Sequence, residues 1–265
     1  KDFFNYYFAD GLRIYSDKIS MFILKCNKKT QDAVIDRIAR IFPFIFIDEV
    51  QDLAGWDLEF LRLLLQSPSE VVLVGDPRQV TYLTNHGSKH MKYRDGGIKA
   101  FIEEKCYGRR HACEIDEESL LMSHRNNAPI CEFSSALFPE YSPSVPCECP
   151  RCREDPPEHQ GIFAVMPRDV DEYMTMYQPQ VLRFKMSTPP EMNFGESKGR
   201  TFQRVLIYPT EDMCEYLRTG ELDTIEKYQT RTKFYVAVTR ARHSVAFVLD
   251  YEEDSRLWPG VTRWR

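Results

Sequence analysis

Two neighbouring carboxylates, Asp48 and Glu49, directly follow the apolar residues 44–47. The apolar run favours extended backbone and predicts a strand buried on both faces of a parallel sheet. Ligands of open α/β sheets bind at the carboxyl ends of the strands. One carboxylate could hold a hydrated Mg²⁺ beside nucleotide phosphates while the other deprotonates an attacking water. The alternative is a strand whose loop happens to be acidic, and residues 44–52 by themselves do not decide between the two.

A second polar strand end follows soon after the first. Residues 56–65 have the spacing of an amphipathic helix, and residues 70–74, which are apolar after Glu70, form a second expected strand that ends at Gly75. This order predicts a βαβ unit with two parallel strands, whose carboxyl ends lie side by side. We therefore expect Asp76 and Gln79 to lie close to Asp48 and Glu49, whereas an ordinary Gly-Asp-Pro turn is the alternative.

Basic and aromatic residues alternate over residues 80–112, where Tyr82, His86 and Lys89 stand. Single-stranded nucleic acid needs this combination, because phosphates attract positive charge and bases stack on rings. A solvated loop with the same composition is the alternative. A further cation, Arg125, follows the apolar residues 120–122 and precedes an expected helix that extends to residue 138, so its guanidinium could face a phosphate.

Residues 139–160 are rich in proline and include Cys147, Cys149 and Cys152, with His159 further on. Three thiolates and an imidazole could fill the tetrahedral shell of a Zn²⁺ ion. The alternative is a set of free thiols in a loop, because no second cysteine pair lies nearby.

From residue 161 onward strands and helices alternate. The expected strands are 162–165, 181–184, 204–208 and 244–249, and the expected helices are 170–177 and 232–240. This alternation predicts a second α/β domain. Residues 1–40 have helical spacing and no catalytic pattern, so we expect them to form a helical packing segment.

Composition limits the classes of function. The chain has 265 residues and a formal net charge of −5, so nucleic acid could bind only through local basic patches. Its apolar runs are far shorter than a membrane span, which predicts a soluble protein with no membrane partner. Eight cysteines without a regular framework are typical of the reducing cytoplasm.

Five segments together resemble the motifs of superfamily 1 helicases of the UvrD/Rep type, over about residues 41–250. In the family's order they are 48–52, which resembles Walker B, 74–79, 123–125, 197–199 with Phe202, and 236–242. Each match is weak by itself, but five in the same order are specific.

The resemblance implies an α/β fold of two RecA-like parallel-sheet domains that face each other, the first incomplete. Residues 1–40 would be a helical remnant, 41–115 the end of the first domain, and 116–265 the second domain with an insertion at 139–160. ATP would be hydrolysed in the cleft between the two domains, and single-stranded or partly duplex DNA would be moved, typically 3′ to 5′.

The family's roles can be carried over position by position. Asp48 would bind Mg²⁺, and Glu49 would activate the hydrolytic water. Contact with the γ-phosphate would come from Gln79, Arg125 and Arg240. Asp76, Lys198 and Gly199 would belong to the nucleotide site and its coupling to the strand, and Tyr82, His86 and Lys89 would lie near the DNA path.

The phosphate-binding pattern Gly-x-x-x-x-Gly-Lys-Ser/Thr is missing from these residues, and the sequence begins at Lys1. We expect a C-terminal portion of a longer helicase that would not hydrolyse ATP efficiently by itself. A degenerate paralogue is the alternative reading.

The compact arrangement and residues 193–199 also resemble the small UvrD-like helicase subunits of anti-phage systems such as Gabija. That resemblance implies an OLD-type nuclease as partner. The competing hypothesis is a catalytically incomplete module that binds DNA or such a nuclease.

Overall fold

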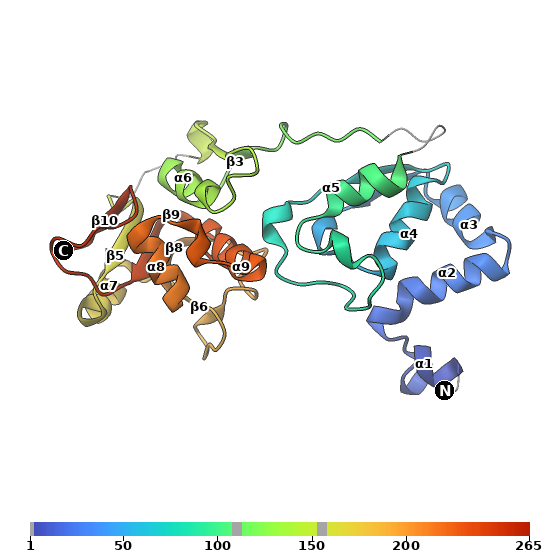
Figure 1. Ribbon diagram of the computed structural model, residues 1–265, viewed down its shortest axis with the longest axis horizontal. Coiled ribbons are helices and arrows are strands. Elements are labelled where there is room, and N and C mark those ends of the chain that lie inside the picture. Colours follow the sequence, from blue (N-terminus) through green and yellow to red (C-terminus); the bar gives the residue numbers. More distant parts are fainter. Residues whose placement is uncertain (1–2, 108–112, 153–157) are drawn as a thin grey trace. The chain divides into compact units, whose positions relative to one another are not determined.

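The computed structural model describes residues 3–107, 113–152 and 158–265 (Figure 1). The chain divides into two compact units, unit 1 with residues Lys1–Ile115 and unit 2 with Asp116–Arg265. Each unit contains helices and a parallel sheet. The predicted α/β class with parallel sheets is therefore confirmed. None of the helices in the described residues has the length and apolar content needed to span a membrane.

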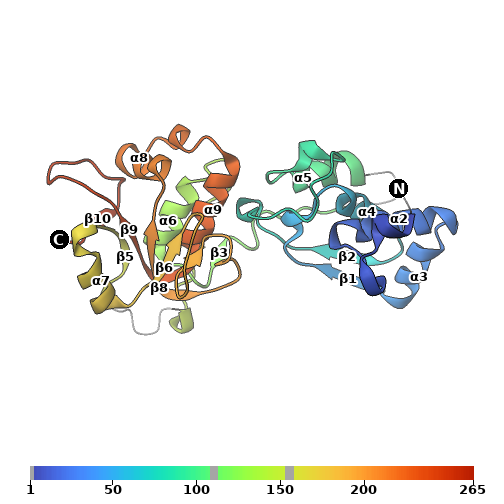
Figure 2. The same ribbon diagram turned by 90° about the horizontal axis from the view of Figure 1, so that it is seen from below.

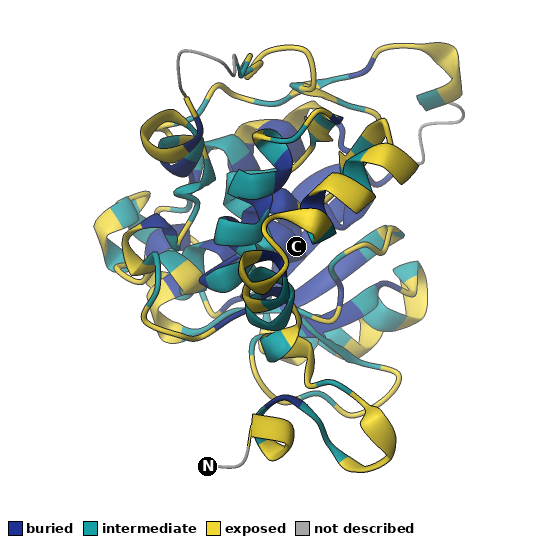
Figure 3. Cartoon of the chain, turned by 90° about the vertical axis from the view of Figure 1, so that its right-hand side faces the viewer, coloured by how far each residue is buried: buried dark blue, intermediate teal, exposed yellow. Residues whose placement is uncertain are grey.

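Unit 1 starts with helices and then forms a βαβ unit. Its α-helices are α1 (Phe3–Tyr7), α2 (Ile19–Lys29), α3 (Ala33–Ile41), α4 (Trp56–Leu65) and α5 (Ile98–Phe101). Helix α1, the short helix beside the N label in Figure 3, is mostly exposed. Helix α4 buries Leu58, Leu61 and Leu64 along one face, because residues three apart lie on the same side of a helix. It contacts α2 and connects the two strands of the unit.

Strands β1 (Phe44–Ile47) and β2 (Glu70–Leu73) run side by side in parallel (Figure 2), with Phe44 opposite Glu70 and Ile47 opposite Leu73. The prediction that residues 44–47 are buried on both faces is wrong. Phe44 and Phe46 are 59% and 75% exposed, while Ile45 and Ile47 are half-buried. Among the described residues, the core that contains α4 packs on only one face of this pair.

Unit 2 is built on a six-stranded parallel sheet in the order β10-β5-β9-β8-β6-β7. Its strands are β5 (Gly161–Val165), β6 (Gln180–Arg183), β7 (Met192–Asn193), β8 (Phe202–Tyr208), β9 (Ala241–Val248) and β10 (Val261–Arg263). Alternate residues of β8 enter two cores: Val205 and Ile207 face one, and Leu206 faces the other. Both faces of this sheet are therefore covered, as parallel sheets require.

The helices of unit 2 are α6 (Ala128–Ala136), α7 (Val170–Tyr177), α8 (Glu211–Thr219) and α9 (Tyr228–Thr239). Helices α6, α8 and α9 supply the larger core, and α7 supplies Tyr173 to the core on the other face. Helix α9 contacts β8, β9 and α6, and α6 contacts β5 and β9, so the two helices pack side by side on the same face of the sheet. Residues 234–239 of α9 are accordingly all buried.

Unit 2 also has a separate two-stranded parallel sheet, whose first strand precedes α6 in the chain. It pairs β3 (Met122–Ser123) with β4 (Val145–Pro146), and Ser123 lies opposite Pro146. Helix α6 begins just beyond β3, where the Asn127 side chain accepts a hydrogen bond from the Ile130 N–H at 3.3 Å. Residues 124–127 are thus held between a short strand and a capped helix.

Candidate functional site

The acidic strand end lies directly beyond β1. Asp48 and Glu49 are both exposed, and Asp48 Oδ1 accepts a hydrogen bond from the Glu49 N–H at 2.8 Å. Glu49 has a left-handed backbone, with φ 53° and ψ 37°. This conformation is unfavourable for a residue with a Cβ, so the surrounding contacts must hold it.

Gln51 is buried and joins the ends of the two strands. Its Nε2 donates to Glu49 Oε2 at 2.5 Å, and its Oε1 accepts from the Asp76 N–H at 3.1 Å. Gly75 leaves room for this side chain, since a Cβ there would lie 2.3 Å from Gln51 Oε1. Gln51 falls within residues 48–52, which resemble Walker B, but no role was predicted for it. A glutamine two residues beyond the strand-end carboxylates was the signal available.

Beyond β2, the carboxylate of Asp76 accepts hydrogen bonds from its own turn. Oδ1 accepts from Arg78 Nε at 2.8 Å, and Oδ2 accepts from Gln79 Nε2 at 2.9 Å. The predicted neighbourhood of Asp76 and Gln79 with Glu49 is therefore present, as one hydrogen-bonded chain through Gln51. Arg78 balances the charge of Asp76, so the aspartate positions the turn.

Arg125 lines a pocket of ≈ 450 Å³ in unit 2 together with Arg242, Ser123, His124 and Thr201. Its Nη1 donates to the Thr239 carbonyl at 3.2 Å. Burial lowers the pKa of Arg125, and the positive charge of Arg242 lowers it further. Two guanidinium groups that disfavour each other in this way make the pocket a suitable place for an anion.

Arg240 is buried and does not line that pocket. Its Nε donates to the Val236 carbonyl at 3.0 Å, and its Nη2 donates to Thr239 Oγ1 at 3.1 Å. Arg242, which the sequence analysis left without a role, lies in the pocket instead. The alternation of β9 was the available signal, because Ala241 faces the core and the next residue must face the opposite side.

Lys198 and Gly199 belong to a tight turn that leads into β8. Within this turn the Lys198 N–H donates to the Gly195 carbonyl at 3.2 Å, and Asn193 Oδ1 accepts from the Gly195 N–H at 2.9 Å. Gly199 has φ +76° and is exposed, and Lys198 is half-buried. Neither residue lines the pocket of Arg125, although Thr201, a little further along the chain, does.

The three expected DNA-contacting residues differ in their surroundings. Tyr82 is 62% exposed, and His86 is exposed as well. Lys89, however, lies 3.4 Å from Glu59 Oε2 and over the ring of Trp56 at 4.6 Å. Part of its charge is thereby neutralised within unit 1. Residues 108–112, the end of the basic and aromatic segment, lie outside the described residues.

Glu59 is the centre of a small charge cluster. Burial opposes its ionisation, but hydrogen bonds from His90 and Arg62 outweigh burial and lower the pKa of Glu59 to about 2. His90 Nε2 lies 2.9 Å from Glu59 Oε2, and Arg62 Nη2 lies 2.6 Å from Oε1. The cluster fixes the segment after Tyr82 against α4.

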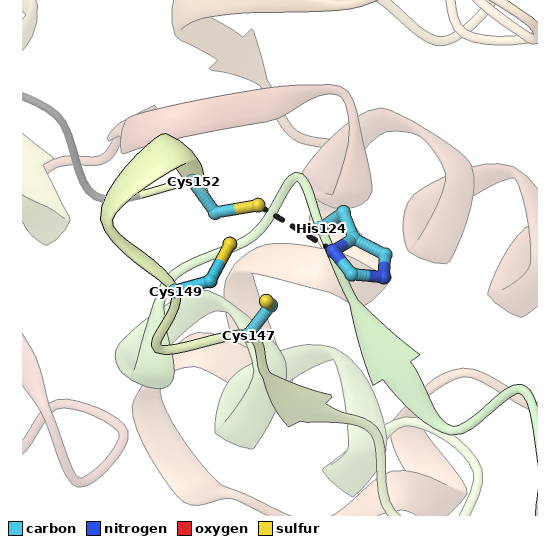
Figure 4. A group of neighbouring side chains, drawn as sticks. All are labelled: His124, Cys147, Cys149 and Cys152. Carbon is cyan, nitrogen blue, oxygen red and sulfur yellow. Dashed lines mark hydrogen bonds between the residues drawn. The ribbon is translucent and has the colours of Figure 1, made fainter.

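Three thiols and one imidazole meet at the end of β3 and β4 (Figure 4). They belong to His124, Cys147, Cys149 and Cys152, and their potential ligand atoms all lie within 4.8 Å of one another. The thiols that the sequence analysis grouped are thus brought together. The imidazole that joins them is that of His124, not that of His159.

His159, the expected fourth ligand, lies elsewhere in unit 2. Its ring is stacked on Phe163 and Tyr177, with centroid distances of 3.8 and 3.9 Å, and its Nε2 lies 2.9 Å from the Tyr173 hydroxyl. Burial, with a further contribution from Arg204, lowers the pKa of His159 to about 4. The assignment of His159 to the thiols is therefore wrong, because its ring is part of an aromatic core.

Comparison with protein families gives one match in unit 1. Residues 12–90 match the family model described as UvrD/REP helicase N-terminal domain. This stretch is similar to UvrD/Rep helicases. It contains the acidic strand end, the Gln51 bridge and the turn with Gln79, and also Tyr82. No curated protein matches the chain.

Several solved helicase structures are similar to this chain at low sequence identity. The helicase nonstructural protein 10 of an arterivirus, in a complex with DNA, has 20% identity and a TM-score of 0.45, and 77% of this chain covers 39% of that one. The helicase of PRRSV has 17% identity and a TM-score of 0.40, with 79% and 35% covered. The present chain spans about two fifths of the length of these structures.

Proposed function

We propose that this chain carries the hydrolytic and phosphate-contacting motifs of an ATP-dependent DNA helicase of the UvrD/Rep type. The observation that supports the proposal best is the Gln51 bridge. It links Glu49, the proposed base, with the turn of Gln79, the proposed phosphate contact, and the whole linkage lies within the stretch that matches the helicase family.

The donor set at the strand end fits a hard divalent cation. Asp48 offers an exposed carboxylate, and Mg²⁺ prefers one or two carboxylates together with substrate phosphates and water. We assign Mg²⁺ binding to Asp48. When bound with ATP, the cation would neutralise charge on the phosphates.

Glu49 is assigned the role of orienting and deprotonating the attacking water. Its side chain is exposed, and one of its oxygens accepts from Gln51, so the carboxylate has a preferred direction. A general base must lie within hydrogen-bond reach of the proton that it removes, and a held carboxylate meets that need better than a freely rotating one.

The remaining phosphate contacts are assigned to Gln79 and to guanidinium groups of unit 2. Arg125 and Arg242 line one pocket and would stabilise the charge that develops during phosphoryl transfer. Arg240 also belongs to this proposal through the family pattern. To contact a phosphate it would have to exchange its hydrogen bonds to Val236 and Thr239 for that contact.

The assigned residues make up part of an ATPase. We propose that the phosphate-binding loop comes from a segment outside these 265 residues, and that the chain is inactive without it. We extend the proposal to translocation along single-stranded DNA, typically 3′ to 5′. We also propose a role in Gabija-like phage defence with an OLD-type nuclease as partner, because residues 193–199 resemble the helicase subunits of those systems.

The test is the substitution Glu49→Gln in the full-length protein. The amide keeps the oxygen that accepts from Gln51 but cannot remove a proton, so DNA-stimulated turnover should fall by about 100-fold or more while ATP binding is retained. Steady-state hydrolysis and nucleotide titration measure the two quantities. The exposed Glu70, the first residue of the other strand, provides the control Glu70→Gln. Undiminished turnover in the Glu49 variant would disprove the assignment of the base.

A further inference from the structure

The cluster of His124, Cys147, Cys149 and Cys152 arises from strand pairing. Because Ser123 and Pro146 are opposite each other in parallel strands, the next residues, His124 and Cys147, leave the sheet side by side. The Cys147 N–H donates to the Ser123 carbonyl at 2.9 Å and extends the pairing by one bond. An imidazole and a thiol separated by many residues in sequence thus become neighbours.

The other two thiols come from a tight turn that follows. Residues Pro150–Cys152 form a single 3₁₀ turn, and the Cys152 N–H donates to the Cys149 carbonyl at 3.0 Å. This turn folds Cys152 back so that its Sγ lies 3.4 Å from His124 Nδ1 (Figure 4). The turn therefore directs Cys149 and Cys152 toward His124 and Cys147.

The spacing suits a tetrahedral ion. With Zn–S bonds of about 2.3 Å and a Zn–N bond of about 2.0 Å, ligand atoms of a tetrahedral site lie roughly 3.5 to 3.8 Å apart. The Cys152 to His124 distance of 3.4 Å is close to this range, and every other pair lies within 4.8 Å. Only small side-chain rotations are needed to reach bonding distance.

We propose that these four residues bind one Zn²⁺ ion in a structural Cys₃His site. Three thiols and an imidazole are soft and intermediate donors of the kind that zinc selects, and four protein ligands leave no open position for catalysis. Binding releases the three thiol protons to solvent, and the imidazole binds in its neutral form. A disulfide within the loop would instead use two thiols and give His124 no role.

The site has a structural consequence for the neighbouring arginine. His124 directly precedes Arg125, and the next residue, Asn126, donates through Nδ2 to the carbonyls of Thr239 and Ala241 at 3.1 and 2.8 Å. Zinc would fix His124, the residue before Arg125, and the two hydrogen bonds of Asn126 fix the residue after it. The ion would thereby attach the proline-rich segment to the strand that presents Arg125, whether or not the ATPase assignment is correct.

Metal analysis of the 265-residue chain, purified under reducing conditions without chelators, tests the proposal. We expect one zinc per folded chain, and a chromogenic zinc indicator should detect its release when a mercurial reagent modifies the thiols. Less than a tenth of an equivalent of zinc, a different bound metal, or a disulfide within the loop would each overturn the proposal.

Matched variants identify the ligands. His124→Ala and Cys149→Ser change exposed side chains and should lower the zinc content at least fivefold, while His159→Phe and Cys26→Ser should retain it. Cobalt substitution gives an independent measurement on the wild type, because the intensity of the thiolate-to-cobalt band reports three thiolates. Zinc retained in His124→Ala but lost in His159→Phe would reject the proposed ligand set.

Discussion

At the scale of single residues, Glu49 shows how a reactive group is held in place. Its left-handed backbone costs on the order of 1 kcal/mol, and the hydrogen bond from Gln51 compensates for part of this cost. Strain of this kind at the end of a strand often accompanies function. Here it turns the side chain away from the direction that an extended chain would give it.

His159 provides a prediction about pH. Its pKa is about 4 in the folded protein and near 6.5 as an unperturbed group, so the unfolded chain binds a proton first as the pH falls. The contribution of neutral His159 to the free energy of unfolding is fully present above pH 6.5. As the pH decreases toward 4, the free energy of unfolding falls by on the order of 2 kcal/mol. Urea unfolding followed at several pH values measures this loss.

The variant His159→Phe keeps an aromatic ring in the stack and removes the titration. We expect it to cost about 1 kcal/mol at pH 8, because the Tyr173 hydroxyl loses its hydrogen bond with His159, and to remove most of the slope between pH 6.5 and 5. An unchanged slope would show that another group causes the pH dependence.

The same residue shows where sequence reasoning reached its limit. Cys147, Cys149 and Cys152 could be grouped from their spacing, but the choice of imidazole could not, because His159 is nearer in sequence and His124 is nearer in space. The pairing of β3 with β4 decides this, and two-residue strands leave almost no periodic signal. Arg240 and Arg242 are a similar case. Arg240 lies just before β9 and is buried, whereas Arg242 is the second residue of β9 and lines the pocket.

At the scale of elements, long periodic segments were predictable. The helices expected at 56–65 and 170–177 are the observed α4 and α7, and the expected strands of unit 2 are found within a few residues of their predicted ends. The short strands β4, β7 and β10 were not predicted. The burial of β1 was wrongly predicted, because an apolar run does not specify which neighbours cover it.

The strand ends of unit 1 give a prediction about packing. A Cβ at Gly75 would lie 2.3 Å from Gln51 Oε1 and 3.1 Å from the Val50 nitrogen, so Gly75→Ala must displace Gln51. We expect a loss of stability of about 1–3 kcal/mol, measured by urea unfolding of the 265-residue chain. The control Gly195→Ala meets its nearest atom at 3.4 Å and should be close to neutral. Equal stability of both variants would contradict the packing argument.

At the scale of the whole molecule, the net charge limits how nucleic acid can bind. A formal net charge of −5 cannot attract DNA to the molecule as a whole, so binding must come from local contacts. Tyr82 presents a ring that is 62% exposed. The charge of Lys89, in the same segment, is partly neutralised by Glu59. Base stacking should therefore contribute a large part of the affinity in unit 1.

The substitution Tyr82→Ala tests this expectation in the full-length protein. We expect affinity for single-stranded DNA to fall by about 1–3 kcal/mol, with little change in its dependence on salt, since no phosphate contact is removed. Fluorescence anisotropy with labelled oligonucleotides measures both quantities. Tyr15→Ala removes another exposed ring and serves as the control. Unaltered affinity of the Tyr82 variant would remove this residue from the DNA path.

The Gln51 bridge has a consequence for which amino acids its position can accept. The side chain must donate at one end to a carboxylate and accept at the other end from a backbone N–H. Glutamate lacks the donor, lysine lacks the acceptor, and asparagine is one methylene shorter. Glutamine combines both groups in one side chain of this reach, so replacing it by any of these three residues would break at least one of the two hydrogen bonds that join the strand ends.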